Sequence, residues 1–218
     1  MIVAIDGPAG SGKTTIAKLL SKKLNISYLD TGATYRALTL KALEGGIDLK
    51  DASLLAQLAA NLNLKLDGQK TYLDGKDVSE EIRTPLIDKN ISIIVAHPKV
   101  RSVMVSLQRA VAKGKDFVVE GRDITTVVFP NAEFKFYLDA DSAIRAERRF
   151  RELEAKGMKI DFTETEKDLR KRDDADKKRE VGALTLSSDA TYIDTTKMSI
   201  EEVINTMVAY IENRKNNK

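Results

Sequence analysis

The chain has 218 residues, enough to bury the core of one compact domain without requiring a second. Its 36 Lys and Arg residues against 33 Asp and Glu residues give a net charge of +3, too small an excess to indicate a nucleic-acid-binding protein. Cysteine is absent, which excludes disulfides and a thiolate nucleophile, and no apolar run approaches the ~20 residues that span a bilayer, so we expect a cytoplasmic protein without a membrane partner.

A phosphate-binding motif follows the first apolar run. Residues 1–5 read M-I-V-A-I and predict a strand, and residues 7–14 read G-P-A-G-S-G-K-T, which fills the pattern G-x-x-x-x-G-K-[ST]. In this pattern backbone amides turn toward phosphate oxygens, Lys13 reaches the β and γ oxygens, and the Thr14 hydroxyl binds Mg²⁺. Apolar residues at helical spacing over 16–24 predict the following helix, and a glycine-rich turn without a ligand is the alternative. The residues expected to hold the nucleotide phosphates are Gly7, Pro8, Ala9, Gly10, Ser11, Gly12, Lys13, Thr14 and Thr15.

Short apolar runs alternate with helical patterns along the chain, which is typical of a parallel β-sheet wrapped by helices. Between residues 63 and 78, alternating apolar residues and two Asp-Gly pairs predict a small β-hairpin, and Pro98 begins a predicted helix that ends near Lys113. Residues 156–180 are dense in charge and poor in apolar residues, so they form either a solvated linker or a mobile lid. The predicted strands of the sheet are residues 2–5, 27–29, 117–119, 134–138 and 192–193.

Polar residues follow two of the predicted strands, at the edge where parallel α/β sheets bind ligands. After the second strand, D-T-G-A-T-Y-R at 30–36 brings a hydroxyl, a ring and a guanidinium to the start of a helix; a helix N-cap at Thr31 followed by an ordinary surface arginine is the alternative. After the third strand, Glu120 is placed to hold the water shell of a metal ion, and Arg122 can bind a phosphate. An Arg-Asp surface turn is the alternative for this segment.

Two further segments concentrate positive charge. Arginines at 145, 148, 149 and 151 lie on one predicted helix, where they repel one another unless anionic neighbours or a ligand compensate. In R-D-D-A-D-K-K-R at 172–179, helical spacing would place Arg172, Asp176 and Arg179 on one stripe that can hold a polar ligand through both charge signs. A solvent-exposed helix face with salt bridges is the alternative for both segments.

Together these segments resemble the bacterial cytidylate kinases, nucleoside monophosphate kinases that transfer the γ-phosphoryl group of ATP to CMP or dCMP. The resemblance covers essentially the whole chain and is carried by GPAGSGKTT, DTGATYR, the EIR at 81–83, the HPKVR at 97–101, EGRDITTVVFPNA and RKRDDADKKRE. It implies an α/β phosphate-loop fold of three layers, with a central five-stranded parallel sheet, a small β-containing acceptor-binding insertion and a helical lid. We expect a monomer with one kinase domain over 1–218, comprising a core (1–62, 98–155 and 181–218), the insertion (about 63–97) and the lid (about 156–180).

The resemblance also implies roles for individual residues. The phosphoryl group is expected to be handled by Lys13, Arg122, Arg148 and Arg179. Mg²⁺ is assigned to Thr14, with Glu120 acting through water. Many members carry Ser and Asp where this chain has Thr31 and Glu120, which keeps both functional groups. The acceptor residues are Thr31, Ser92, Arg101 and Asp123 for the base, Arg36, Arg122 and Arg179 for the phosphate, and Arg172 and Asp176 for the ribose.

The expected chemistry needs no general base, because the second pKa of a phosphate monoester is about 6 and the attacking oxygen of CMP is anionic near neutral pH. Cytosine offers an amino donor that Asp123 can accept and acceptor atoms that Arg101 can bind, so the sequence favours CMP over UMP. Three alternatives stay open at this point: another small-molecule or nucleoside monophosphate kinase acting on UMP, AMP or thymidylate, a GTPase switch, and a nucleic-acid-binding ATPase. The chain has no Asn-Lys-x-Asp segment, which disfavours the GTPase.

Overall fold

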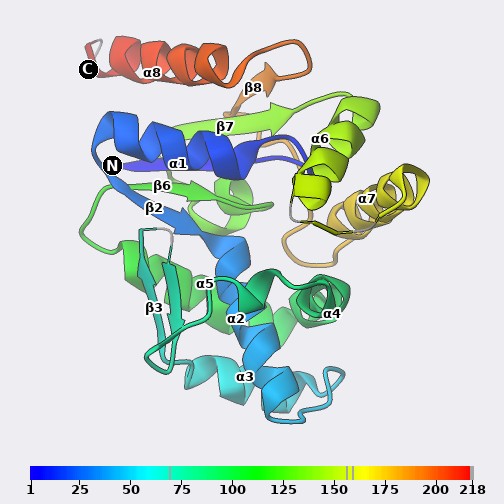
Figure 1. Ribbon diagram of the computed structural model, residues 1–218. Coiled ribbons are helices and arrows are strands. Elements are labelled where there is room, and N and C mark those ends of the chain that lie inside the picture. The colour runs from blue at the N-terminus through cyan, green and yellow to red at the C-terminus, as the bar shows by residue number, and fades with distance from the viewer. Residues whose placement is uncertain (69, 156, 159, 217–218) are drawn as a thin grey trace.

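The computed structural model describes residues 1–68, 70–155, 157–158 and 160–216. Its centre is a five-stranded sheet in the order β2-β6-β1-β7-β8, in which every neighbouring pair is parallel (Figure 1). The α/β class and the parallel sheet are therefore confirmed, and all five strands lie where the sequence predicts them. The strands are β1 Ile2–Asp6, β2 Ser27–Asp30, β6 Phe117–Glu120, β7 Phe134–Asp139 and β8 Thr191–Asp194.

The two faces of the central sheet bury their side chains in different cores. Val3 and Ile5 of β1 pack with residues of α1 and α8 on one face, whereas Ala4 packs on the other face with residues of α5 and η2. Successive residues of a strand point to opposite faces, so a continuous apolar run is the pattern expected of a sheet covered on both sides. The covering elements are α1 Lys13–Leu24, α5 Pro98–Ala112, the π-helical turn η2 Ile124–Val128 and α8 Ile200–Asn216.

A second core lies next to the sheet, where residues of α2 to α5 pack with β4. The hairpin predicted between residues 63 and 78 is confirmed, because β3 pairs antiparallel with β4 and β4 with β5. Asp74 and Gly75 turn the chain between β4 and β5 with φ angles of 52° and 84°. Residue 69 of this segment lies outside the described residues. The elements are α2 Thr31–Glu44, α3 Ala52–Ala60, β3 Leu64–Asp67, β4 Lys70–Leu73, β5 Lys76–Asp77, η1 Glu81–Arg83 and α4 Pro85–Ala96.

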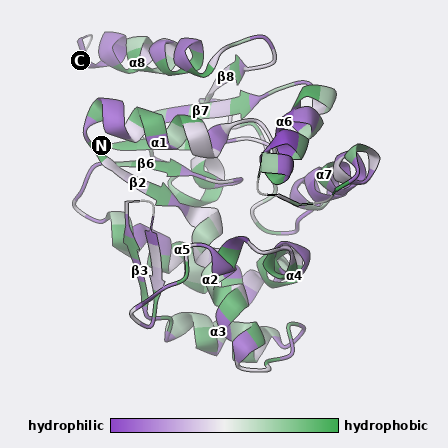
Figure 2. Ribbon diagram, viewed as in Figure 1, coloured by the Kyte–Doolittle hydropathy of each residue, from purple (hydrophilic) through white to green (hydrophobic). Residues whose placement is uncertain are grey.

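Two hydrophilic helices, α6 Ser142–Ala155 and α7 Phe162–Lys177, lie beyond the carboxyl ends of the central strands (Figures 1 and 2). Asp161 caps α7, because its carboxylate accepts a hydrogen bond from the backbone N–H of Glu164 at 2.9 Å. α7 buries one face, so this part of the charged segment is not a solvated linker. The predicted lid begins at residue 156, which lies outside the described residues together with residue 159. Within the described ranges, no helix is both long and apolar enough to cross a bilayer.

Candidate active site

The phosphate-binding motif forms the turn between β1 and α1 at the carboxyl edge of the sheet. Gly10 and Gly12 have φ angles of 75° and 86°, a region that residues with a Cβ rarely adopt. A Cβ added to Gly10 would lie 2.7 Å from the backbone oxygen of Arg145, so this glycine also permits the close approach of α6. A tight glycine turn that leads directly into a helix N-terminus is suited to bind an anion through backbone amides.

Lys13 lies across this loop and is only 4% exposed. Its Nζ donates hydrogen bonds to the backbone oxygen of Pro8 at 2.7 Å and to Ser11 Oγ at 3.3 Å. Burial, followed by the positive charge of Arg122, lowers the pKa of Lys13 to about 7. A phosphate group at the loop would supply the negative charge that holds this side chain in its ammonium form.

Thr14 and Glu120 bring two oxygen atoms together beside the loop. Thr14 Oγ1 donates to Glu120 Oε1 at 2.7 Å, and the hydroxyl of Tyr28 donates to the same oxygen at 3.1 Å. Burial and then the charge of Asp30 raise the pKa of Glu120. Mg²⁺ accepts a hydroxyl and a carboxylate as hard oxygen ligands and completes its shell with water and substrate phosphates, so this pair fits a magnesium ion.

Three arginines from different elements lie near one another, and the charges of two of them lower the pKa of the third. Arg36 lies on α2, Arg122 follows β6, and Arg172 lies on α7. Burial is the largest influence on Arg172, and the charges of Arg122 and Arg36 add to it, so that its pKa falls to about 10. Arg172 makes no hydrogen bond or ion pair with any residue that the structure describes. Like charges gathered at this point are unfavourable by themselves, and the charge of an anion would offset their repulsion.

Carboxylates hold the other arginines of this group. Asp88 of α4 pairs with Arg36. Asp176 of α7 accepts a hydrogen bond from Arg122 Nε at 2.8 Å and another from Arg179. Burial alone would raise the pKa of Asp176, but Arg122 and Arg179 outweigh it and the pKa is lowered. α7 ends at Lys177, so Arg179 lies outside the helical stripe that the sequence predicted, although its guanidinium still reaches Asp176.

A buried ion pair joins Arg101 of α5 to Asp123, which follows β6. The guanidinium carbon of Arg101 lies 5.6 Å from the centre of the Tyr35 ring. Two buried polar groups here, Arg101 Nε and the Tyr35 hydroxyl, have no hydrogen-bond partner among the residues that the structure describes. Burial raises the pKa of Asp123, even though Arg101 acts in the opposite direction. Because unpaired buried donors are costly, these groups are well placed to bind a polar ligand.

The chain matches the family model described as cytidylate kinase over residues 3–213. It belongs to the cytidylate kinase family. The cytidylate kinase of Caldanaerobacter subterraneus subsp. tengcongensis is 46% identical over 216 residues, which cover 99% of this chain and 96% of that protein. The cytidylate kinase of Pelotomaculum thermopropionicum is 47% identical and is covered to 95%, against 96% of this chain. A crystal structure of an uncharacterized protein from Eubacterium ventriosum shares the fold with a TM-score of 0.52 at 16% identity, covering 97% of this chain and 98% of that chain.

Membership of the cytidylate kinase family makes this chain a kinase that uses nucleotides as substrates. It confirms the resemblance found in the sequence and disfavours the other kinases, the GTPase and the nucleic-acid-dependent ATPase. The division into core, insertion and lid and the roles of individual residues stay predictions.

Two residues predicted to face the base of the acceptor differ in their surroundings from Arg101 and Asp123. Thr31 is the first residue of α2 rather than its cap, and Thr31 Oγ1 donates to the backbone oxygen of Glu120 at 2.7 Å. The cap is Asp30, which accepts a hydrogen bond from the backbone N–H of Ala33 at 2.9 Å. Ser92 is exposed on α4 and forms no hydrogen bond with any of the residues that the structure describes.

The arginines of α6 have different surroundings: some lie close to the phosphate loop or to acidic partners on other elements, and one lies on a solvent-exposed face with a salt bridge. Arg148 donates to the side chain and backbone oxygens of Thr195 at 3.0 and 2.7 Å, next to the phosphate loop. Arg149 pairs with Glu152 at 2.9 Å and with Asp88 at 3.3 Å. Arg151 is exposed and pairs with Glu147 one turn away, so the solvated helix face is the correct interpretation for Arg151.

Sequence reasoning missed two buried carboxylates near the loop, Asp6 and Asp173. Asp6 accepts hydrogen bonds from the backbone N–H groups of Ile124 and Thr125, both at 2.8 Å, and so fixes the segment that carries Arg122 and Asp123. The position of Asp6 at the end of a predicted strand, directly before the motif, is a signal that could have indicated it. Asp173 bonds to Ala9 and Arg145, which lie 164 and 28 residues away in the chain.

Proposed function

We propose that the protein transfers the γ-phosphoryl group of ATP to CMP or dCMP, with ADP and CDP or dCDP as products. The observation that carries this proposal is Arg172, a half-buried arginine that pairs with no residue of the described structure and whose pKa is lowered by desolvation and then by the charges of Arg122 and Arg36. Arg122 and Arg172 also influence the pKa of Lys13, so an anion held by these arginines would lie near the phosphate loop. Two anion sites that face each other are what phosphoryl transfer between nucleotides requires.

On the donor side, backbone amides of the loop and Lys13 would bind the phosphates of ATP. Mg²⁺ bound by Thr14, with Glu120 through water, would neutralise charge on the β and γ phosphate oxygens. Arg148, held near Ser11 through Thr195, is positioned to approach the same phosphates. The donor site is thus built from β1, α1, β6 and α6.

On the acceptor side, the arginine group would bind the phosphate of CMP and bring its oxygen into line with the γ phosphorus. The nucleophile carries negative charge at neutral pH, because the second pKa of a phosphate monoester is about 6, so the protein needs no general base. His97 fits this view, since its Nε2 is engaged by the backbone oxygen of Leu49 at 2.8 Å, beside the start of α5. Catalysis is then positioning and charge neutralisation by Lys13 and the arginines.

We also propose that residues of about 63–97 form the acceptor-binding insertion, that about 156–180 act as the lid, and that the protein is a cytoplasmic monomer. Antiparallel β3 and β4 and the separate helix α7 support the first two assignments. The lack of cysteine agrees with a reducing compartment.

An acceptor panel tests this function. With ATP and Mg²⁺ held constant, release of ADP is measured with CMP, dCMP, UMP, AMP and GMP as acceptors. CMP and dCMP are expected to support the fastest turnover, and CDP or dCDP should appear in equal amount to ADP. Turnover of UMP as fast as that of CMP at low substrate would contradict the assignment of Asp123 to cytosine.

Arg172→Ala is expected to raise KM for CMP by about 10- to 150-fold, because hydrogen bonds to charged groups contribute about 1.5–3 kcal/mol. KM for ATP should change little, since Arg172 lies on the acceptor side. Steady-state kinetics with each substrate varied in turn measures both effects. Arg170→Ala is the matched control, because Arg170 is exposed on the same helix and pairs with Glu166. An unchanged KM for CMP would mean that Arg172 does not bind the acceptor and belongs to a solvent-exposed helix face.

A further inference from the structure

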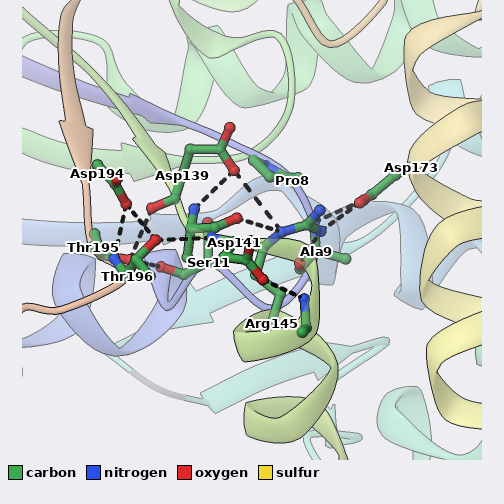
Figure 3. A network of polar contacts seen from close by, with 12 residues as sticks. Pro8, Ala9, Ser11, Asp139, Asp141, Arg145, Asp173, Asp194, Thr195 and Thr196 are labelled. Atoms are coloured by element: carbon green, nitrogen blue, oxygen red, sulfur yellow. Dashed lines mark hydrogen bonds and ion pairs between the residues drawn. The ribbon is translucent and has the colours of Figure 1, made fainter.

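Asp173 connects α7 to the phosphate loop, although it belongs to none of the sites assigned above. Its Oδ1 accepts a hydrogen bond from the backbone N–H of Ala9 at 3.2 Å. Its Oδ2 accepts one from Arg145 of α6. Figure 3 shows Asp173 reaching from its helix toward both groups. Asp173 is 5% exposed, and these two hydrogen bonds satisfy both of its carboxylate oxygens inside the protein.

Arg145 completes this connection from the other side. Its Nη1 donates to the backbone oxygen of Ala9 at 3.0 Å (Figure 3). Its Nε donates to the backbone oxygen of Ala140 at 3.0 Å. Asp173 and Arg145 therefore engage both polar backbone groups of Ala9. The buried ion pair between Arg145 and Asp173 thus joins four parts of the chain: the phosphate loop at Ala9, the segment after β7, α6 and α7.

α7 has little apolar surface with which to hold its position. Its buried residues are Thr165, Leu169, Asp173 and Asp176, of which only Leu169 is apolar. The ring of Phe162 meets that of Phe150 edge to face at 5.7 Å at the start of the helix. Polar contacts must therefore set the position of α7 along the core, and hydrogen bonds of this kind are more directional than apolar packing.

Asp173 and Asp176 are three residues apart and so lie on the same face of α7. Asp173 contacts the loop that would hold the donor, and Asp176 contacts Arg122 and Arg179 of the acceptor side. Arg172 lies directly beside Asp173 in the chain. One turn of helix thus carries contacts to both halves of the site.

We propose that Asp173 is a positioning residue, which docks α7 on the phosphate loop through Ala9 and Arg145 and thereby keeps the donor and acceptor sites in register. This inference rests on the proposed function. When the docking is intact, the acceptor oxygen attacks the γ phosphorus and water is kept out. When it is lost, water can take the place of the acceptor, and ATP and water give ADP and inorganic phosphate.

The test measures ADP and CDP released by the full-length protein with saturating ATP, Mg²⁺ and CMP. Asp173→Ala is expected to raise the ratio of ADP to CDP from about one to about three or more, because the loosened helix admits water. Asp173→Asn keeps an oxygen acceptor for Ala9 N–H and should lie between the two. Asp174→Ala is the matched control, since Asp174 is exposed on the same helix.

The ratio separates positioning from folding, because a partly unfolded preparation makes less of both products in the same proportion. A ratio that stays near one in Asp173→Ala, whatever the rate, would overturn the proposal. Binding of a non-hydrolysable ATP analogue gives a second check. Tighter binding by Asp173→Ala, by tenfold or so, would mean that the carboxylate competes with phosphate for the Ala9 amide, which also overturns the positioning role.

Hydrogen exchange keeps this proposal distinct from the proposed function. In nucleotide-free protein, Asp173→Ala should speed amide exchange in residues 162–177 and leave the central strands unchanged, whereas Asp174→Ala should change neither. This result does not depend on which acceptor the enzyme uses. If wild-type protein failed to phosphorylate CMP, the proposed function would fall while the docking contact could still be established; unchanged exchange in α7 would refute the docking contact alone.

Discussion

Replacing Lys13 with methionine is expected to lower kcat for CDP formation by about 10²–10³-fold, the loss found when one preorganised donor to a developing negative charge is removed. Methionine keeps most of the length of the lysine side chain, so the packing of the side chain against the loop is largely preserved. Lys22→Met is the control, because Lys22 is an exposed lysine of the same helix. Steady-state rates and a melting temperature for each variant are the measurements. A kcat for Lys13→Met within threefold of the wild-type value would remove Lys13 from the phosphoryl-transfer site.

The pKa of Lys13 adds a pH dependence of known sign. Burial and Arg122 lower this pKa to about 7, so in the free enzyme the ammonium form is complete below that pH and is lost above it. The value of kcat/KM for ATP reports the free enzyme and should fall as the pH rises above 7. Lys13→Arg keeps its charge at every accessible pH and should lack this fall. Both proteins meet the same titrating substrates, so the difference between their profiles isolates Lys13.

The parts of the molecule that could be predicted are those in which the signal is local. The strand at residues 2–5, the phosphate loop and the hairpin near 74–75 are each specified by neighbouring residues, through a short continuous apolar run, glycine conformations and an Asp-Gly turn respectively. The start of α2 differs by one residue from the alternative that placed a cap at Thr31, because the structure makes Asp30 the cap and Thr31 the first helical residue.

The parts that could not be predicted depend on pairs that are distant in the chain. Asp173 lies 164 residues from Ala9 and 28 from Arg145, and nothing in the charged run around it separates it from its exposed neighbour Asp174. Helical spacing placed Arg179 on the stripe of Arg172, but the helix ends before it. Its contact with Asp176 survives because a long side chain can reach back across one turn.

The pairing of the arginines explains how such a concentration of charge is stable without a ligand. Asp88 pairs with Arg36, and Asp176 pairs with both Arg122 and Arg179, so the carboxylates offset part of the positive charge of the group. A nucleotide phosphate can take over these guanidinium groups, because it offers more oxygen acceptors and more negative charge than one carboxylate. Arg172 forms no ion pair with a carboxylate in the part of the chain that the structure describes, although the charges of Asp176 and Asp88 act on it, so we expect the acceptor phosphate to bind Arg172 without displacing a bonded partner.

The second large effect concerns the choice of base. Asp123→Ala is expected to lower kcat/KM for CMP and to reduce the preference for CMP over UMP by about 10- to 100-fold, since a site built around a hydrogen bond discriminates strongly against the partner that lacks it. The cytosine amino group can donate to the carboxylate, whereas the uracil carbonyl at the same position cannot. Competition between CMP and UMP in one reaction measures the preference directly.

Asp123→Asn makes this test sharper, because an amide can donate as well as accept. It should use UMP better than Asp123→Ala does, with the amide N–H bound to the uracil carbonyl. Both variants remove the negative charge that pairs with Arg101, but only Asn keeps an oxygen that Arg101 can donate to, so the melting temperature of each variant is measured alongside its preference. If both retained the wild-type preference for CMP, then Asp123 would serve only to hold Arg101, and the base would have to be chosen by the orphaned donors of Arg101 and Tyr35.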